Sequence, residues 1–345
     1  MVVNLIKAHP KRKMNMIAYE NIKKIVAEAK PSMAWDGKED FGAWQTRARA
    51  KLCELVGLDK MIPCEPEYTE EWTHKEEGFT ETRFQIQTEP GYFVPCHILV
   101  PDGAKRPEKT FICLQGHTKG MHVSMNRTLF EGEDVSDRED DEFCLRAVRE
   151  GYVAVALEQR NFGERGGTPG GPDCYAESVT NLLIGRCTIG ERVWDVMRLI
   201  DLLLERYADT VDRDNIYIMG NSGGGTATTY AAAIDLRIAG AIPSCAVCSF
   251  ASSIGAMHHC ACNYVPRVLE YFDMGELISL IAPRKLVVVN GEKDNIFPIG
   301  GAYEVVAVGK KAYAAAGVPE RIAHVVGPEG HRFYANIAYE AFKKM

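Results

Sequence analysis

The residues best suited to chemistry surround Ser222, in the stretch Gly-Asn-Ser-Gly-Gly at positions 220–224. The apolar run Ile216 to Met219 before it predicts a buried strand, and the small residues Thr226 to Ile234 after it predict a helix. A serine at the apex of a strand–turn–helix connection projects its Oγ into a cleft, as a nucleophile must. The two outer glycines would let strand and helix pass closely, and the N–H of Gly223 would point toward a developing oxyanion.

A serine hydroxyl is a weak nucleophile and needs a base, which a third group must orient. Candidates for these two partners are an acidic residue and a histidine that follow later predicted strands, because the ends of those strands reach the same edge of the sheet as the serine. Asp294 follows the predicted strand Leu286 to Val289 and is the predicted acid, with Glu292 as the alternative. His331 follows the next predicted strand, Arg321 to Val326, on a glycine-rich loop, and is the predicted base.

The elements that must position these residues alternate in type. Residues 80–87 and 92–100 flank a Glu-Pro-Gly turn and predict a hairpin. Six short apolar runs then alternate with helical stretches, which is typical of a doubly wound, mostly parallel α/β sheet, here of eight strands. The apolar runs are Thr110–Leu114, Val153–Leu157, Ile216–Met219, Ala239–Ile242, Leu286–Val289 and Arg321–Val326. The helical stretches are Asp140–Glu150, Ile189–Tyr207, Gly224–Asp235, Gly301–Ala316 and His331–Lys344.

Residues 1–75 contain no convincing strand and are predicted to form a helical N-terminal extension to a domain of residues 76–345. Met16 to Ala29 and Asp40 to Val56 have helical spacing, and the second stretch carries an apolar stripe. The stripe consists of Trp44, Leu52, Leu55 and Val56. Such an extension packs on the main domain or on a second subunit, so it is a candidate surface for a homo-oligomer.

Composition excludes some partners. A net charge of −7 argues against nucleic acid and anionic membranes, which need a basic face. No apolar run approaches the about 18 residues of a membrane span. The 11 cysteines lie scattered in apolar segments, which is typical of free thiols in a reducing compartment. The basic N-terminus lacks the apolar core and cleavage site of a targeting peptide, so we expect a cytoplasmic protein.

The order of these elements, with the serine turn after the fifth predicted strand, resembles the α/β-hydrolase fold over residues 75–345. More narrowly, the chain resembles the bacterial acetyl xylan esterases and cephalosporin-C deacetylase-like esterases, which also carry a helical N-terminal extension. Leu114-Gln115-Gly116-His117 stands where that group commonly has a His-Gly-Tyr type motif. Gln159 to Arg165 stands where it has an Arg-Gly-Gln-Gly type loop. These departures bear on the substrate more than on the fold.

The resemblance implies an oxyanion hole formed by the backbone N–H groups of Gly223 and His117. The His117 ring could be a second base or only part of the wall, and the sequence leaves this open. Two loops are expected beside the cleft, Gly163 to Tyr175 and the segment after the sixth predicted strand. The side chains expected to line the substrate pocket are Phe162, Tyr175, His258, His259, Cys260 and Tyr264.

A metal site is the alternative for the run His258-His259-Cys260-Ala261-Cys262, whose ligand types suit zinc. Two adjacent histidines and a Cys-x-Cys pair cannot easily aim four groups at one tetrahedral centre, and no matching second half is recognisable elsewhere in the sequence. We therefore expect no metal, and activity that survives chelators. No Gly-Lys-Ser/Thr follows the glycines around Ser222, so we expect no nucleotide and no other cofactor.

The resemblance and the three candidate residues together predict a serine hydrolase of carboxylic esters, acting through an acyl-enzyme. By the same resemblance, the expected substrates are short acyl esters, acetyl first, on a carbohydrate or similar alcohol. Two alternatives remain. One is a serine peptidase of the prolyl-oligopeptidase type, against which the lack of a propeller-sized N-terminal domain counts. The other is a binding protein without catalytic activity on the same fold.

Overall fold

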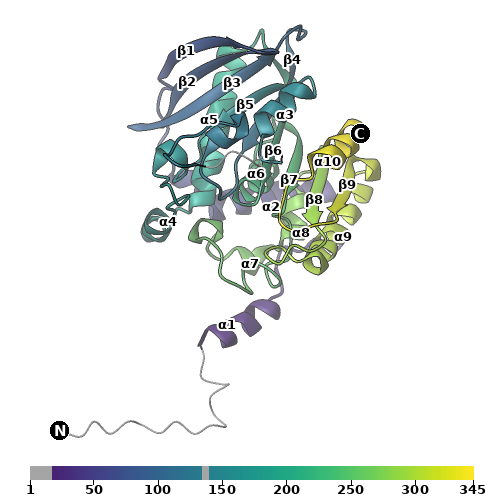
Figure 1. Ribbon diagram of the computed structural model, residues 1–345. Coiled ribbons are helices and arrows are strands. Elements are labelled where there is room, and N and C mark those ends of the chain that lie inside the picture. The colour runs from purple at the N-terminus through teal and green to yellow at the C-terminus, as the bar shows by residue number, and fades with distance from the viewer. Residues whose placement is uncertain (1–17, 134–139) are drawn as a thin grey trace, which may run out of the picture.

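A nine-stranded sheet runs through the computed structural model, which describes residues 18–133 and 140–345 (Figure 1). The strands lie in the order β1-β2-β3-β5-β4-β6-β7-β8-β9. Strands β1, β2, β3 and β5 pair antiparallel in turn, whereas β5, β4 and β6 to β9 form a parallel array. The predicted doubly wound, mostly parallel sheet is therefore confirmed.

The strands are β1 (Tyr68–Glu76), β2 (Phe79–Glu89), β3 (Tyr92–Pro101), β4 (Glu108–Leu114), β5 (Val153–Leu157), β6 (Val211–Asn221), β7 (Ile238–Ser244), β8 (Lys285–Gly291) and β9 (Ile322–Gly327). The α-helices are α1 (Ala18–Ala27), α2 (Phe41–Leu55), α3 (Phe143–Arg149), α4 (Tyr175–Asn181), α5 (Thr188–Arg206), α6 (Gly223–Ile234), α7 (Val268–Tyr271), α8 (Met274–Ser279), α9 (Ile299–Ala315) and α10 (Ala335–Lys343).

Strand β1 is a correction to the sequence prediction, which found no strand before residue 76 and counted eight. It pairs with β2 along its length, from Tyr68 opposite Ile86 to Glu76 opposite Phe79. Because β1 is an edge strand with most of its side chains exposed, its sequence lacks the apolar alternation that marks a half-buried strand. The predicted domain boundary between residues 75 and 76 therefore falls inside β1.

Helix α2 belongs to the main core. Its side chains Trp44, Ala48, Leu52 and Leu55 are buried in one cluster with apolar side chains of the sheet. The predicted stripe is thus confirmed, and Asp40 caps the helix by accepting a hydrogen bond from the Ala43 N–H at 2.9 Å.

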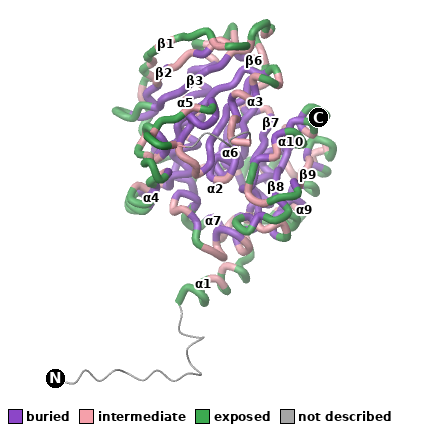
Figure 2. Tube along the Cα trace, in the orientation of Figure 1, coloured by how far each residue is buried: buried purple, intermediate pink, exposed green. Residues whose placement is uncertain are grey.

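Helix α1 contrasts with α2, since it projects from the body of the molecule (Figures 1 and 2) and contacts it near Gly255 through Val26 in its last turn. It leaves Tyr19, Ile22 and Ile25 exposed. The predicted start of this helix at Met16, and the basic N-terminal residues before it, lie outside the described residues.

Helices cover both faces of the sheet. Alternate side chains of β4 enter opposite clusters, with Ile112 in one and Phe111 in the other. The first cluster is closed by α2, α5, α6, α8 and α9, and the second by α3 and α10. The central strands are buried on both faces (Figure 2), which explains their runs of apolar residues.

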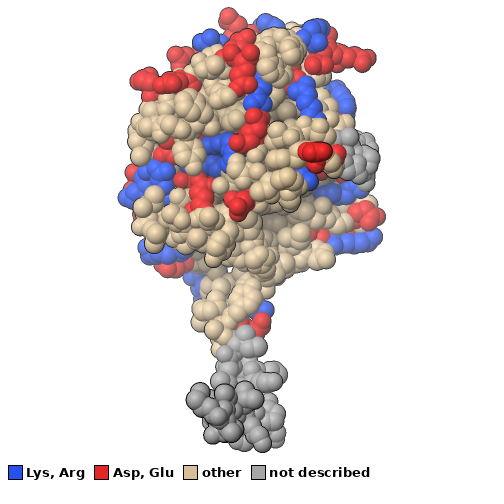
Figure 3. All heavy atoms as spheres, turned by 60° about the vertical axis from the view of Figure 1, so that its left-hand side comes forward, with Lys and Arg blue, Asp and Glu red and all other residues tan. Residues whose placement is uncertain are grey.

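The parallel array brings the loops after β4, β6, β7, β8 and β9 to one edge of the sheet, where α/β folds place their sites. In the part of the chain that the structure describes, no helix has the length and apolar character to cross a bilayer. All 11 cysteines are free, as predicted. On the face drawn in Figure 3, acidic and basic side chains are interspersed.

Candidate active site

Ser222 sits in a strained turn between β6 and α6. Its backbone has φ +55° and ψ −123°, a positive φ that non-glycine residues rarely adopt. Hydrogen bonds on both sides hold it there, since the Ser222 N–H donates to the Ser244 carbonyl and the Thr226 N–H donates to the Ser222 carbonyl, each at 2.8 Å. The sharp strand–turn–helix connection predicted around Ser222 is confirmed.

Two glycines make this turn possible. A Cβ on Gly224 would lie 2.1 Å from the carbonyl oxygen of Leu114 on β4, and a Cβ on Gly220 would lie 2.5 Å from the carbonyl carbon of Gly224. Any side chain there would force strand and helix apart. The close passage predicted for these two positions is therefore confirmed.

Asp294 and His331 meet across the loops that follow β8 and β9. His331 Nδ1 lies 2.8 Å from Asp294 Oδ2. The other carboxylate oxygen, Oδ1, accepts hydrogen bonds from the backbone N–H groups of Ile296 at 2.8 Å and Phe297 at 3.0 Å. The Phe297 ring stacks on the His331 ring with centroids 5.9 Å apart. The imidazole is thus oriented by one acid and one aromatic ring.

Electrostatics keep the Asp294 carboxylate charged. Burial by itself would raise its pKa, but the hydrogen bond from His331, the charge of that ring and the two backbone N–H groups outweigh it and hold the pKa below its usual value. The neighbouring Cys245 behaves in the opposite way, because burial and the charge of Asp294 raise the pKa of its thiol to about 12. Glu292, the alternative acid, is exposed to solvent.

Ser222 and His331 line one cavity of about 480 Å³. Asp140, Asp141 and Arg332 also line it, and Arg332 pairs with Asp140. Ser222 lines a second, larger cavity of about 920 Å³ as well. The serine therefore stands where two cavities of different character meet.

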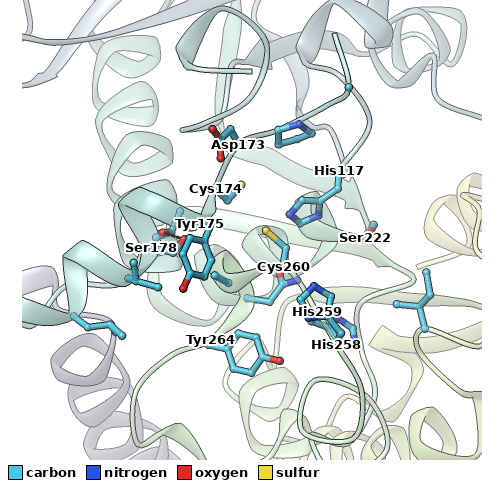
Figure 4. A pocket seen from close by; sticks show the side chains of 18 of the residues that line it. His117, Asp173, Cys174, Tyr175, Ser178, Ser222, His258, His259, Cys260 and Tyr264 are labelled. Atoms are coloured by element: carbon cyan, nitrogen blue, oxygen red, sulfur yellow. Dashed lines mark hydrogen bonds between the residues drawn. The ribbon is translucent and has the colours of Figure 1, made fainter. Parts of the chain in front are cut away.

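The larger cavity receives its wall from the loops on either side of α4 and around residue 260 (Figure 4). Of the predicted pocket residues, five lie in its wall: Tyr175, His258, His259, Cys260 and Tyr264. Tyr175 and Tyr264 are 71% and 43% exposed, so their ring faces are available to a ligand. Sequence reasoning missed Asp173, Ser178 and Asn263, which are isolated polar residues without a motif.

Phe162 differs from its prediction as a pocket residue. Its side chain is fully buried and is absent from the wall of the cavity. It packs behind the wall, with its centroid 5.3 Å from the His117 ring and 4.6 Å from the guanidinium carbon of Arg192. An aromatic residue in a loop beside a cleft can face either way, and the local sequence does not decide which.

A buried ion network anchors the loop that carries Phe162. Arg160 is 1% exposed and binds Glu89, Glu191 and Asp195 at 2.9, 3.0 and 3.1 Å. Arg165 binds Asp195 at 2.7 Å. Burial would raise the pKa of Asp195, but the two arginines hold it well below its usual value. The network fixes the loop against α5, which carries Glu191 and Asp195.

His117 lies at the end of β4, beside the serine turn. A Cβ on Gly223 would lie 2.4 Å from Cε1 of the His117 ring, so ring and helix start are in close contact. Among residues 18–133 and 140–345, no acceptor is within hydrogen-bond range of the His117 backbone N–H. The N–H of Gly223 is the first of α6 and has no acceptor in a preceding helical turn.

The His117 ring also contacts a group of cysteines. The expectation that the run around Cys260 has no second half is wrong, because His117 and Cys174 approach Cys260 and Cys262. Their ligand atoms all lie within 4.8 Å of one another. His259 points elsewhere, with Nε2 at 3.1 Å from Ser253 Oγ. The second half was missed because it comes from two distant loops.

A match to a known family gives the class of protein. The family model described as "Abhydrolase family" matches residues 7–182, slightly more than half of the chain. The chain therefore belongs to this α/β-hydrolase family. The matched range ends before Ser222, Asp294 and His331, so the family match does not cover these three residues.

Individual proteins similar to this chain have the names of hydrolases and esterases. YtaP, a candidate hydrolase of Bacillus subtilis (strain 168), is 26% identical over 72% of this chain and 81% of its own. The crystal structure of a candidate acetyl xylan esterase of Bacteroides fragilis NCTC 9343 superposes with a TM-score of 0.80, at 17% identity over 95% of each chain. A glucuronoyl esterase of Solibacter usitatus reaches 0.67, at 16% identity over 92% of this chain and 98% of its own. At such identities the structural likeness establishes the fold.

Proposed function

We propose that this protein is a serine hydrolase of carboxylic esters, with Ser222 as nucleophile, His331 as base and Asp294 as the acid that orients it. One observation carries the proposal. Ser222 is held at a positive φ where a cavity opens, and His331, bound through Nδ1 to the buried Asp294 carboxylate, lines that same cavity. With Nδ1 engaged, the imidazole keeps Nε2 for the serine proton.

The reaction follows from these positions. Ser222 Oγ attacks the ester carbonyl and its proton passes to His331, so that Asp294 faces an imidazolium. The N–H groups of Gly223 and His117 would hold the oxyanion, and each such donor is worth about 3–4 kcal/mol of barrier. The alcohol leaves with the proton of His331. Water, activated by the same imidazole, then releases the acid from Ser222.

The proposed substrates are short acyl esters of carbohydrates, acetyl first. Exposed faces of Tyr175 and Tyr264 in the larger cavity suit a sugar ring, since each offers an apolar surface with a polar tip. The smaller cavity is lined by the charged Asp140, Asp141 and Arg332, which is unsuited to a long fatty chain. The names of the two structural relatives, both carbohydrate esterases, support the same class.

Labelling with a fluorophosphonate probe tests the nucleophile. We expect the probe to modify Ser222, and Ser222→Ala to abolish both labelling and ester hydrolysis while unfolding at the same temperature as the wild type. Ser178 is a matched control, because it also lines the larger cavity but hydrogen-bonds to Thr188 at 2.8 Å. Ser178→Ala should label fully. An unlabelled wild type would favour a binding protein without catalytic activity.

A substrate series tests the second half of the proposal. Hydrolysis of p-nitrophenyl esters should fall steeply beyond butyrate, and acetylated xylo-oligosaccharides should release acetate. A preference for octanoate, or cleavage of peptide amides with no hydrolysis of acetates, would contradict the carbohydrate ester proposal but leave Ser222 as the proposed nucleophile.

The 11 free cysteines further support a reducing compartment, and we propose that the protein acts in the cytoplasm.

A further inference from the structure

Four potential metal ligands converge on one point beside the larger cavity. His117 follows β4, Cys174 precedes α4, and Cys260 and Cys262 flank a single residue in the loop after β7. Figure 4 shows His117, Cys174 and Cys260 together on one part of the wall. The four residues are thus contributed by three loops far apart in the chain, which only the closed fold brings together.

The separations suit one small ion. His117 Nε2 lies 3.0 Å from Cys262 Sγ, and the sulfurs of Cys260 and Cys262 are 3.3 Å apart. No two of the four ligand atoms are more than 4.8 Å apart. Tetrahedral zinc, with Zn–S of about 2.3 Å and Zn–N of about 2.0–2.1 Å, sets its ligand atoms about 3.5–3.8 Å from one another. The two shortest separations fall a few tenths of an ångström short of that range, and no pair exceeds it by more than about 1 Å, so small side-chain shifts would seat the ion.

The Cys-x-Cys spacing is no obstacle in this loop. Cys260 has an extended backbone, with φ −58° and ψ 137°, and a single 3-10 turn begins at the next residue. That turn brings the side chain of Cys262 back beside that of Cys260. Because the turn supplies two ligands on one side, His117 and Cys174 need only supply the other two.

Charge gives a second, independent argument. Arg192 on α5 is fully buried, and its Nη1 and Nη2 donate to Cys262 Sγ at 3.4 Å and Cys174 Sγ at 3.5 Å. In the described ranges no carboxylate pairs with Arg192, whose other hydrogen bond goes to the Arg160 carbonyl at 3.0 Å. A buried cation requires a negative partner. The sulfurs are the groups beside it that can carry negative charge.

We propose that His117 Nε2 and the sulfurs of Cys174, Cys260 and Cys262 bind one zinc ion. Three thiols lose their protons to solvent as the ion binds, and the three thiolates leave the divalent ion with a net charge of −1. Arg192 neutralises that charge. Four protein ligands close the coordination shell, so the ion is structural and holds no water for catalysis.

Such an ion would fasten three loops of the cavity wall to one another. It would also hold the His117 ring against Gly223, at the start of α6. Phe162 and Arg192 close the site from the core side, whereas Cys260 and His117 border the cavity, through which an ion can enter. The metal site does not depend on the proposed hydrolase activity, and metal content tests it separately.

Metal analysis of the full chain, produced without a polyhistidine tag in zinc-supplemented cells, tests the proposal. We expect about one zinc per chain after gel filtration. Cys174→Ser and Cys260→Ser should each lose most of it. Two controls should keep it: Cys64→Ser, a half-buried cysteine outside the cluster, and His258→Asn, a cavity histidine next in sequence to the cluster but absent from it.

Cobalt substitution makes the test independent of whether the variants fold. Titrating Co²⁺ into the zinc-free wild type should give strong visible d–d bands of a tetrahedral site and a thiolate-to-cobalt charge-transfer band, both abolished by added Zn²⁺. Three results for the folded wild type would together overturn the proposal. It would hold less than a tenth of an equivalent of zinc, it would give no such bands, and its thiols would react as free cysteines or as a disulfide. Zinc that stays in Cys174→Ser and Cys260→Ser but leaves in His258→Asn would overturn it too.

Discussion

Two polar clusters flank Ser222, and the chain builds them in different ways. Asp294 and His331 follow consecutive strands, β8 and β9, so the alternation of strands and loops delivers them in chain order to one edge of the sheet. The cluster proposed to bind zinc, His117 with Cys174, Cys260 and Cys262 (the zinc-ligand cluster), draws on three loops separated by unrelated elements. The first cluster therefore has a linear order that can be recognised, and the second has none.

The two clusters also differ in how a buried charged side chain finds its partners. The carboxylate of Asp294 is met by His331 and two backbone N–H groups, all supplied by its own loop and the next one. Arg192 is met by sulfurs whose charge depends on whether they are ionised. The first cluster is complete in itself, whereas the net charge of the second depends on how many of its sulfurs are ionised.

The largest expected effect separates the two candidate acids in the loop after β8, Asp294 and Glu292. Asp294→Asn should lower kcat by about 10⁴, since the amide stabilises the wrong imidazole tautomer and no imidazolium. Glu292→Gln, its matched control, should stay within about twofold of wild type because Glu292 is exposed. Steady-state kinetics with p-nitrophenyl acetate measure both. The reverse order would make Glu292 the acid and break the picture of a self-contained cluster.

Gly223→Ala couples the two clusters. Its Cβ would stand 2.4 Å from the His117 ring, so the ring must move, which would displace the proposed zinc ligand and disturb the adjacent N–H groups proposed to hold the oxyanion. We expect kcat to fall by about 10²–10³ and the zinc content to drop in the same protein. Gly300→Ala on α9 is the control, since nothing lies within 4 Å of its Cβ position. Lost activity with unchanged zinc would show that the clusters act independently.

Substitutions of Phe162 and Tyr175 distinguish a residue that packs behind the wall of the larger cavity from one that faces the cavity. Phe162→Leu removes packing behind the zinc-ligand cluster and should cost about 1–2 kcal/mol, a few degrees in Tm, with KM unchanged. Tyr175→Leu removes an exposed ring from the cavity and should raise KM for an acetylated oligosaccharide roughly two- to tenfold, with Tm unchanged. A raised KM for Phe162→Leu would indicate that Phe162 contributes to the substrate pocket, as the sequence predicted.

The smallest expected effect is a change in the free energy of unfolding at low pH. Because the pKa of Asp294 is lower in the folded protein than in the unfolded chain, its ionisation adds stability that is complete above the unfolded pKa of about 3.9 and disappears as the pH falls through the folded value. The difference in unfolding free energy between wild type and Asp294→Asn should therefore shrink on going from about pH 6 to pH 3. Urea unfolding at these pH values measures it, and a difference that grows in acid would contradict the assigned charge.

Several errors of prediction have one physical origin. Strand β1 was missed because an edge strand with exposed side chains carries no apolar alternation. Phe162 was placed in the pocket because periodicity says nothing about which way a loop side chain turns. The convergence of His117 and Cys174 on Cys260 and Cys262 was missed because a ligand set was sought within one stretch of sequence. In each case the deciding contact is made by an element distant in the chain.

The sequence by itself determined the doubly wound sheet, the tight turn at Ser222 and the cysteines' free state. These depend on local properties: apolar runs of strand length, glycines where backbones cross, and thiols scattered through apolar segments. Only the tertiary structure decided that His117 and Cys174 complete the pair at Cys260 and Cys262. Their convergence depends on the packing of three loops, and loop packing is a sum of long-range contacts that no short stretch of sequence encodes.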